Sequence, residues 1–445
     1  NVVSSKNANL VNKQNTYLVL GGRSDVRRAF LKFSLPEIQP GDMVIQAQMM
    51  VVSVDGDNAL RRLHLHRVMQ DWEPDHLCWY NKPVYEEQIL DTYQYYANDV
   101  KVLTFGITDL VKDWYENGKN FGLLLKTGHE TKDMETILLG PGTHEGVDDL
   151  RPQILITYVS YSGLEGYWTY HSQSAGRAGT VSINDYNGNM TYIHSLLAMS
   201  GNRMPINLDL VYNNTDYKQS IGYGAGFRLN YYQIIKKVKV GETDYYRYID
   251  GDGTGHYFYE NKEKKQWQDE LDKEMILEIG TTDEVGFIIK NKDNGRLIFN
   301  KEGYLVQIKD RNENAAKVSW TDEKISKLED GAGRITELNY NEDGLLSLIK
   351  DPVGREKKLQ YDNKKQLIKI IDVDGEEILL SYANKEGLLN GITNIDGYQL
   401  KYEYTEGTPE RVKRVCEYAK DQPGNALNMV YGNNKTRFTD DRGRV

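Results

Sequence analysis

The sequence predicts a mostly β fold, and three observations support this prediction. Tyrosine is abundant, with 32 residues against 10 prolines and 9 phenylalanines, and aromatic residues favour strands. Apolar and polar residues alternate in many short segments, which is the pattern of half-buried strands. The last third of the chain repeats one pattern with a period of 20 or 21 residues. We therefore expect an N-terminal β-sandwich with one short helix, a β-rich capping segment and a repeated β-sheet.

The size and charge of the chain restrict its class. A chain of 445 residues exceeds the usual size of one hydrophobic core, so we expect more than one domain. A net charge of -10 argues against a nucleic-acid-binding protein, which would concentrate lysine and arginine. The two cysteines, Cys78 and Cys416, give no disulfide framework. No run of 18 apolar residues is present, so we expect no membrane insertion.

Residues 1–160 form the first predicted domain. In RRAFLKF, Ala29 and Leu31 alternate with Arg28 and Lys32, and RPQILITYVS closes the region with another alternating strand. In ALRRLHLHRV two leucines alternate with Arg62, His64 and His66. The segment GITDLVKDWYENG predicts the helix, with Thr108 as its N-cap, Leu110, Val111 and Trp114 on one side, and Gly118 at its end.

The order of LKFSLP, QDWEPDHLCWYNKP, ITDLVKDWYENG, FGLLLK and RPQILITY resembles the DNRLRE domain, which is related to carbohydrate-binding module family 96. This resemblance implies a jelly-roll sandwich that in some relatives binds anionic polysaccharide. Charge-assisted hydrogen bonds to carboxylates would then come from an outward basic set. Its members are Arg28, Lys32, Arg62, His64 and His66. The alternative is a solvated sheet face without a ligand. Trp72 and Trp79 could stack on sugars or belong to the core.

Residues 161–282 resemble the segment that joins DNRLRE domains to the repeat core of wall-associated Rhs proteins, and they contain hairpin signals such as NDYNGNMTY. We expect a β-rich cap for the repeats, because an open sheet edge invites strand addition.

The strings DGDN, Asp55–Asn58, and DGDGTG, Asp250–Gly255, hint at structural calcium. A calcium loop would need a glutamate at position twelve, where His66 and Asn261 stand. We therefore interpret both strings as turns and expect no cofactor.

Residues 283–445 contain about six copies of the repeat. An aromatic residue recurs at intervals of 20 or 21 residues, always two positions after an aliphatic one. The aromatic positions are Phe299, Trp320, Tyr340, Tyr361, Tyr382 and Tyr402. Pairs such as Leu346 and Ile349 are spaced by three, which breaks strict alternation and predicts a β-bulge.

An Asp-x-x-Gly string ends the apolar part of each unit and predicts a turn, with the aspartate accepting from the backbone and the glycine closing the turn. The turn residues are Asp330, Asp351 and Asp372 with Gly333, Gly354 and Gly375. The phrases GRITELNYNEDGLLSLIKDPVGREKKLQYD and GYLVQIKDRNEN resemble the YD repeats of the Rhs family, which implies a spiralling sheet that forms a shell. That family can cleave itself at an aspartate motif. Leu346 and Arg355 depart from this motif, so we expect no cleavage at Asp351.

Together these features predict a non-enzymatic N-terminal part of a secreted or cell-wall-associated bacterial Rhs protein. The sandwich would bind a polysaccharide or a cell-surface glycan, and the shell would present or encapsulate a C-terminal effector of the full-length protein, such as a toxin. Two alternatives remain open. The sandwich could be a structural cap that binds no glycan, or the basic face could belong to a polysaccharide lyase, which needs a tyrosine or histidine base.

Overall fold

The structure is a computed structural model in which the chain forms two compact units. The description covers residues 1–11, 16–55, 57–140, 151–201, 203–241, 243–271, 274–280, 282, 284–383, 387–407, 409–420, 422–432 and 435–445. Unit 1 comprises residues 1–36 and 43–159, and unit 2 comprises residues 37–42 and 160–445. In these ranges no helix has both the length and the apolar character needed to cross a bilayer.

Unit 1 contains ten described strands in one curled sheet. The strands are β1 (Val2–Ser4), β2 (Tyr17–Gly21), β3 (Arg27–Leu31), β4 (Asp42–Ser53), β5 (Leu60–Val68), β6 (Tyr85–Tyr96), β7 (Lys101–Gly106), β8 (Leu123–Thr127), β9 (Glu135–Leu139) and β10 (Gln153–Ser160). Their order is β10-β4-β9-β2-β3-β8-β5-β6, with β1 beside β3 and β7 beside β4. The short 3-10 helix η1 (Pro74–His76) lies in the connection from β5 to β6. Strands β3, β8, β5 and β6 are therefore neighbours, and they carry most of the predicted basic set.

The α-helix α1 (Thr108–Asn117) begins and ends close to the predicted residues. Leu110, Val111 and Trp114 are buried, and Gly118 ends the helix with a φ of 67° and an N–H bond to the oxygen of Trp114, as predicted. The N-cap prediction is wrong. Thr108 is already helical, and its hydroxyl oxygen accepts from the N–H of Ala47 at 3.0 Å instead of capping its own helix.

Unit 2 begins with a small antiparallel sheet. Its described strands are β11 (Tyr170–Ser174), β12 (Thr180–Asn184), β13 (Met190–Ala198), β14 (Asn207–Asn213) and β15 (Phe227–Leu229), in sequence order, with 3-10 helices η3 (Gly176–Ala178) and η4 (Asn214–Asp216). This sheet and the following repeats share one hydrophobic core. The buried Tyr212, for example, donates its hydroxyl to the oxygen of Gly387 and accepts from the N–H of Leu389. The segment predicted as a cap thus packs against the repeats.

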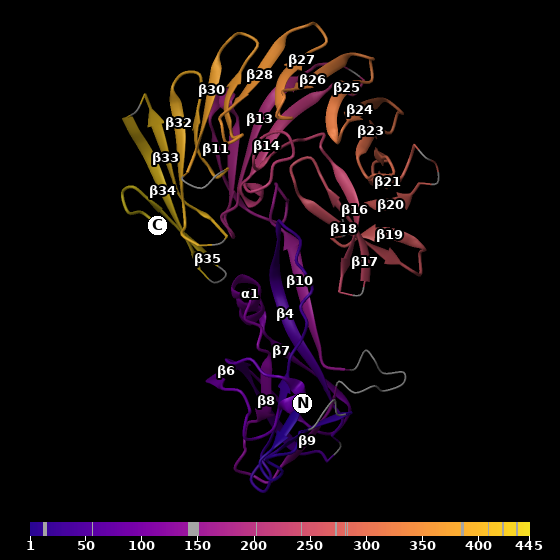
Figure 1. The fold of residues 1–445 in the computed structure, drawn as a ribbon, viewed down its shortest axis with the longest axis vertical. Helices are drawn as coiled ribbons and strands as arrows, with labels where there is room; N and C mark the ends of the chain where they lie inside the picture. The colour runs from indigo at the N-terminus through magenta and orange to yellow at the C-terminus, as the bar shows by residue number, and fades with distance from the viewer. Residues whose placement is uncertain are drawn as a thin grey trace. The chain divides into compact units, whose positions relative to one another are not determined.

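A long antiparallel sheet of twenty described strands follows, and each strand pairs with the next in the sequence. The strands are β16 (Ile234–Val240), β17 (Thr243–Ile249), β18 (Gly255–Asn261), β19 (Gln266–Asp269), β20 (Ile276–Ile279), β21 (Phe287–Lys290), β22 (Arg296–Phe299), β23 (Leu305–Lys309), β24 (Ala315–Thr321), β25 (Lys324–Glu329), β26 (Ile335–Tyr340), β27 (Leu346–Lys350), β28 (Glu356–Tyr361), β29 (Leu367–Ile371), β30 (Glu377–Tyr382), β31 (Leu389–Thr393), β32 (Tyr398–Tyr404), β33 (Val412–Ala419), β34 (Gln422–Gly432) and β35 (Lys435–Asp440). Figure 1 shows these strands following one another along a curved sheet. A mostly β chain is confirmed.

The start of the long sheet curls back on itself. Ile234 of β16 forms an antiparallel bridge with Tyr304, and the N–H of Ile235 donates to the oxygen of Gly303. The edge of β16 is therefore partly covered by the turn between β22 and β23. This arrangement satisfies backbone groups that an open edge strand would expose.

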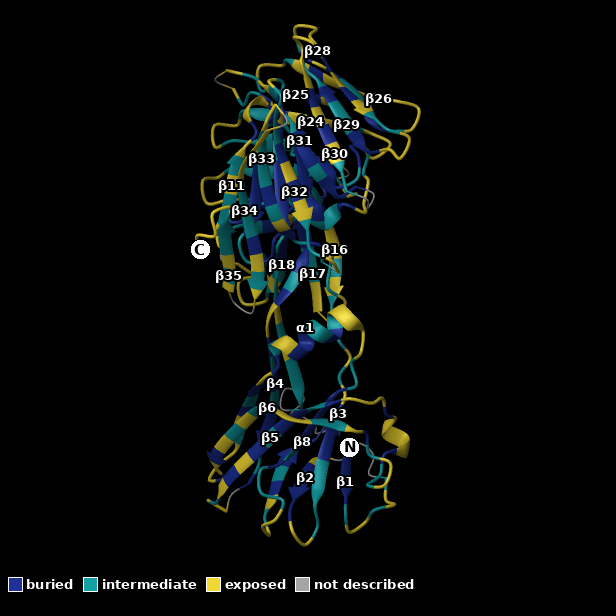
Figure 2. Cartoon of the chain, turned by 90° about the vertical axis from the view of Figure 1, so that its left-hand side faces the viewer, coloured by how far each residue is buried: buried dark blue, intermediate teal, exposed yellow. Residues whose placement is uncertain are grey.

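Buried and exposed side chains alternate along the strands of the repeats, as the sequence pattern predicts. In β28 the side chains of Lys357 and Leu359 are buried while those of Glu356, Lys358 and Gln360 are exposed, and Figure 2 shows this alternation along the strands. The register of β26 against β27 shifts between Asn339 and Tyr340, which confirms the predicted bulge. Equivalent shifts occur in the other described repeats, including those of β28 with β29 and β30 with β31.

Candidate functional site

Three neighbouring strands of unit 1 place three basic side chains in one row. Ala29 of β3 pairs with Leu125 of β8, and Arg28 and Lys126 are the next residues of the two strands beyond this pair. Lys126 in turn pairs with His64 of β5. All three side chains are partly exposed. Like charges on neighbouring strands destabilise a sheet, so Arg28 and Lys126 favour an anionic partner, as does His64 when it is protonated.

Arg28 has one such partner within the protein. Its guanidinium donates from Nε and Nη2 to the two carboxylate oxygens of Glu130, at 2.7 and 2.8 Å. The same guanidinium lies 5.3 Å from the ring centre of Trp79 and 5.4 Å from that of Tyr85. The bidentate bond fixes the plane of the guanidinium and leaves it against two aromatic rings.

Cations surround the two rings. The Lys126 ammonium lies 5.3 Å from the centre of Tyr85, and the Lys82 ammonium lies 4.4 Å from that of Trp79. Burial and the neighbouring Arg28 lower the pKa of Lys82. We call the set Arg28, His64, Trp79, Lys82, Tyr85 and Lys126 the basic aromatic face. Such rings can cover the apolar face of a sugar while the cations bind carboxylates.

His64 and His66 have different surroundings on β5. His66 is buried, its Nδ1 donates to the oxygen of Glu86 at 2.9 Å, and its ring meets Tyr85 edge-on at 5.3 Å. His64 is partly exposed, and burial lowers its pKa, as do the nearby positive groups His66, Lys126, Arg62 and His129. His66 therefore packs against the ring of Tyr85. His64 is partly exposed, so its side chain is accessible to a ligand.

Gly128 leaves room for Arg62 and His64. A Cβ at this position would lie 2.9 Å from both Arg62 Cγ and His64 Nε2, closer than side chains tolerate. Arg62 is exposed and donates from Nε and Nη2 to the side-chain oxygen of Gln94, at 3.0 and 2.6 Å. Arg62 thus lies beside His64 at the edge of the basic aromatic face.

Among the described contacts, none connects Lys32 to the basic aromatic face. Its ammonium binds the carboxylate of Asp71 at 2.7 Å. Asp71 lines a cavity of about 340 Å³ together with Trp72, Glu73 and Asn81. Trp72 is a core residue, because only 7% of it is exposed, its ring packs on Phe30 and its Nε1 donates to the oxygen of Phe121.

The sequence did not single out Tyr85, Lys82 or Lys126. Lys126 stands in the strand LLLKT, where a single charged residue between buried neighbours indicates a position that reaches the surface. Tyr85 begins a strand after a proline-containing loop, a position that carries no alternation signal. Lys126 pairs with His64 across β8 and β5, and Tyr85 and Lys82 meet this group only through ring contacts of the folded chain.

The string DGDGTG forms a turn, as predicted. The carboxylate of Asp250 accepts the N–H groups of Asp252 and Thr254, at 3.1 and 3.0 Å, and Asp252 accepts the N–H and hydroxyl of Thr254. Burial, followed by the charge of Asp250, raises the pKa of Asp252 to about 7. In the first string Asp55 is buried beside Arg61, and Gly56 lies outside the described residues.

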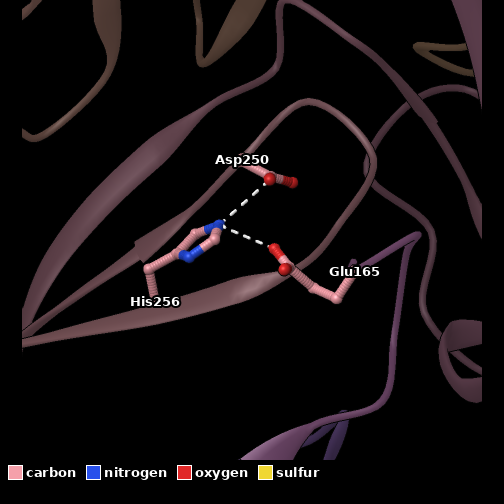
Figure 3. A group of neighbouring side chains, drawn as sticks. All are labelled: Glu165, Asp250 and His256. Carbon is pink, nitrogen blue, oxygen red and sulfur yellow. Dashed lines mark hydrogen bonds and ion pairs between the residues drawn. The ribbon is translucent and has the colours of Figure 1, made fainter. Parts of the chain in front are cut away.

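Glu165, Asp250 and His256 form a second polar group, in unit 2 (Figure 3). His256 Nε2 lies 3.0 Å from Asp250 Oδ2 and 3.7 Å from Glu165 Oε1. These are the residue types that could hold a metal ion, and among the described residues they are grouped closely enough to do so.

The repeated aspartates all lie in turns. Asp330 and Asp351 each accept two backbone N–H groups through Oδ1, and Asp372 accepts the N–H of Val373. The N–H of Gly333, Gly354 or Gly375 donates to the oxygen of the aspartate three residues earlier, and each glycine has a φ between 81° and 85°. A positive φ favours glycine.

Residues 3–155 match the profile of carbohydrate-binding module family 96. No curated protein matches the chain. A crystal structure of TcdB2-TccC3-TEV superposes with a TM-score of 0.26 at 12% identity, over 94% of this chain and 22% of that one. The chain thus spans about a fifth of the length of that protein. Hadza microbial sialidase Hz136 superposes with a TM-score of 0.12 at 9% identity, over 95% and 91% of the two chains. Scores this low do not establish a shared fold.

Proposed function

We propose that residues 3–155 bind an anionic polysaccharide through the basic aromatic face. The match to carbohydrate-binding module family 96 supports a binding role for this region. The observation that carries the proposal is the row of Arg28, Lys126 and His64 on neighbouring strands. A polymer with one carboxylate per sugar would neutralise this row, and its sugar rings would pack on Tyr85 and Trp79.

The proposal for the whole chain rests on the repeat pattern. Residues 160–445 would be the first turns of a Rhs-type shell, with the small sheet as its cap, in a secreted or cell-wall-associated bacterial protein. The repeats supply structure rather than chemistry, because the described aspartates Asp330 and Asp351 accept bonds from their own turns. The role of the chain would be attachment and presentation of an effector, without catalysis.

The test compares a polyuronate with its carboxyl-reduced, neutral form, using the complete chain and isothermal calorimetry. We expect saturable binding of the polyuronate and at least tenfold weaker binding of the reduced polymer. The double variant Lys82→Gln, Lys126→Gln should lose most of the affinity. The double variant Lys112→Gln, Lys119→Gln removes the same charge from the region of α1 and should keep it.

The outcomes separate the alternatives. Equal affinity of the two double variants would assign the binding to general electrostatic attraction and contradict the proposed face. Absence of binding to every acidic and neutral polymer tested would favour a structural cap. Release of unsaturated products that absorb in the ultraviolet would identify a polysaccharide lyase instead of a binding module.

A further inference from the structure

A buried polar group in unit 2 lies where two segments of the chain meet. Asp250 and His256 flank the turn between β17 and β18, and Glu165 belongs to the segment that precedes β11. The side chains of His256 and Glu165 are 4% and 6% exposed. Figure 3 shows both carboxylates directed toward the same ring nitrogen of His256. The ligand atoms of the three residues all lie within 4.8 Å of one another.

The spacing of these atoms fits a small tetrahedral ion. Zinc bonds of about 2.0 to 2.2 Å place neighbouring ligand atoms roughly 3.4 Å apart in a tetrahedron. The observed separations from His256 Nε2, 3.0 Å to Asp250 and 3.7 Å to Glu165, lie on either side of this value. The two carboxylates lie within 4.8 Å of each other, so they would have to approach the ion together with the imidazole to complete three ligand positions.

The surroundings hold the donor atoms in place. The ring of His256 stacks on Tyr248 with a centroid distance of 5.4 Å and an angle of 24°. Asp250 Oδ1 accepts two backbone N–H groups, which leaves Oδ2 facing the histidine. Preorganised ligands of this kind are typical of metal sites, where neighbouring groups orient each donor.

A cavity adjoins the group and supplies a fourth position. Glu165, Asp250 and His256 line a cavity of about 320 Å³, together with Asn291 and Met275. An imidazole with two carboxylates suits zinc and similar transition metals. Calcium needs six to eight oxygen ligands, and backbone N–H groups already bind Asp250 Oδ1 and both carboxylate oxygens of Asp252 in the DGDGTG turn.

We propose that Glu165, Asp250 and His256 bind one divalent transition-metal ion of the zinc class, with the fourth coordination position facing the cavity. The ion would cross-link the segment 160–165 to the β17–β18 turn. Direct bonds already join these segments, from Thr254 Oγ1 to the oxygen of Ser162 and from the N–H of Gly255 to Ser160 Oγ, both at 3.1 Å. The inference is independent of polysaccharide binding, because all these residues belong to unit 2.

The test uses the complete chain after removal of metal with a chelator. Titration with Zn²⁺ should show one saturable site and raise the melting temperature, and Co²⁺ should give the intense visible bands of a tetrahedral complex. Glu165→Gln and His256→Gln should each weaken binding at least tenfold and abolish the cobalt bands. Glu260→Gln, on the exposed face of β18, should leave both unchanged.

Two controls keep the result decisive. His64→Gln should retain the site, which excludes binding at the histidine pair of β5. If His256→Gln fails to fold, Glu165→Gln decides, because glutamine preserves the size of the side chain and removes the anionic ligand. Undiminished binding in Glu165→Gln, or no saturable binding by the unmodified chain, would overturn the proposal.

Discussion

The hydroxyl of Tyr361 donates a hydrogen bond of 2.8 Å to the main-chain oxygen of Leu346, fifteen residues earlier. The same bond joins Tyr340 to Ile325 and Tyr382 to Leu367, again across fifteen residues. Trp320 and Tyr404 make the equivalent bonds to Leu305 and Leu389. Each accepting residue lies at the register shift of its strand pair, and the aromatic side chain supplies a hydrogen-bond donor to its carbonyl there.

Replacement of Tyr361 by phenylalanine should destabilise unit 2 by about 1 to 2 kcal/mol, because the ring stays buried while the Leu346 carbonyl loses its donor. Hydrogen exchange followed by mass spectrometry should show faster exchange in peptides that cover residues 346–361. Tyr80→Phe, at a side chain that is 75% exposed, should change nothing. An exchange rate in Tyr361→Phe equal to that of the unmodified chain would mean that the bond contributes no stability.

The repeat could be predicted from the sequence because the same physical requirement recurs in each unit. The alternation of apolar and polar residues predicts the buried face of each strand, and the apolar pairs spaced by three residues predict the bulge. Leu400 and Tyr402 are both buried as predicted, but the last unit differs in which tyrosine makes the bond. Tyr404 and not Tyr402 makes the repeated bond, and the register shift falls between Glu403 and Tyr404. Tyr404 keeps the ten-residue spacing from its turn residue Asn394 that Tyr382 keeps from Asp372, but it lies 22 residues after Tyr382, so a period of 20 or 21 selects Tyr402 instead.

The turn aspartates should contribute through their backbone bonds rather than through their ion pairs. Asp351 Oδ1 accepts from the N–H groups of Val353 and Arg355, at 3.0 and 2.8 Å, and Asp351→Ala should cost about 1 to 2 kcal/mol in the free energy of unfolding. Asp351→Asn retains an acceptor oxygen and should cost less. Arg355→Gln removes only the ion pair of a largely exposed side chain and should cost less than about 0.5 kcal/mol. Urea unfolding of the three variants measures these differences, and a larger cost for Arg355→Gln than for Asp351→Ala would reverse the assignment.

The candidate site could be predicted only in part. Alternation along β3 and β5 identifies Arg28 and His64 as candidates, but it also selects Lys32, whose ammonium binds Asp71. The other residues of the basic aromatic face depend on which strands become neighbours in the sheet. Lys126 meets His64 only because β8 pairs with β5, and these strands are separated by more than fifty residues of chain. A single sequence contains no direct record of that pairing.

Binding of a polyuronate should strengthen as the pH falls from 7.5 to 5. Burial and neighbouring positive groups lower the pKa of His64 below its usual 6.5, so the free side chain is mostly neutral at pH 7.5. An anionic ligand stabilises the protonated imidazole, and binding therefore takes up a proton in this range. Calorimetry of the complete chain should show the increase, and His64→Gln should reduce it. The same pH dependence in His64→Gln as in the unmodified chain would place the responsible group elsewhere.

The contribution of His194 to the stability of unit 2 should fall as the pH is lowered from 6.5 toward 4. His194 is buried, and its Nδ1 donates to the oxygen of Ala178 at 3.1 Å. Burial, followed by the nearby charge of Lys357, lowers its pKa to about 4. Between pH 4 and 6.5 the unfolded chain therefore binds a proton that the folded chain does not bind, so protonation favours unfolding.

The size of this effect follows from the difference between the two pKa values. One pH unit within the window corresponds to about 1.4 kcal/mol, so the contribution of His194 should fall by about 2 kcal/mol between pH 6.5 and pH 5. Asp252, whose pKa burial raises to about 7, changes the stability in the opposite direction over the same range. Asp372 pairs with Lys357 at 3.3 Å, and despite burial the N–H of Val373 and the Lys357 ammonium lower the pKa of Asp372, so it titrates below the window. Urea unfolding at pH 7.5, 6 and 5 should show that His194→Gln gains stability relative to the unmodified chain as the pH falls, whereas His76→Gln, at an exposed histidine of unit 1, should behave as the unmodified chain. An unchanged slope in His194→Gln would show that His194 does not remain neutral in the folded unit.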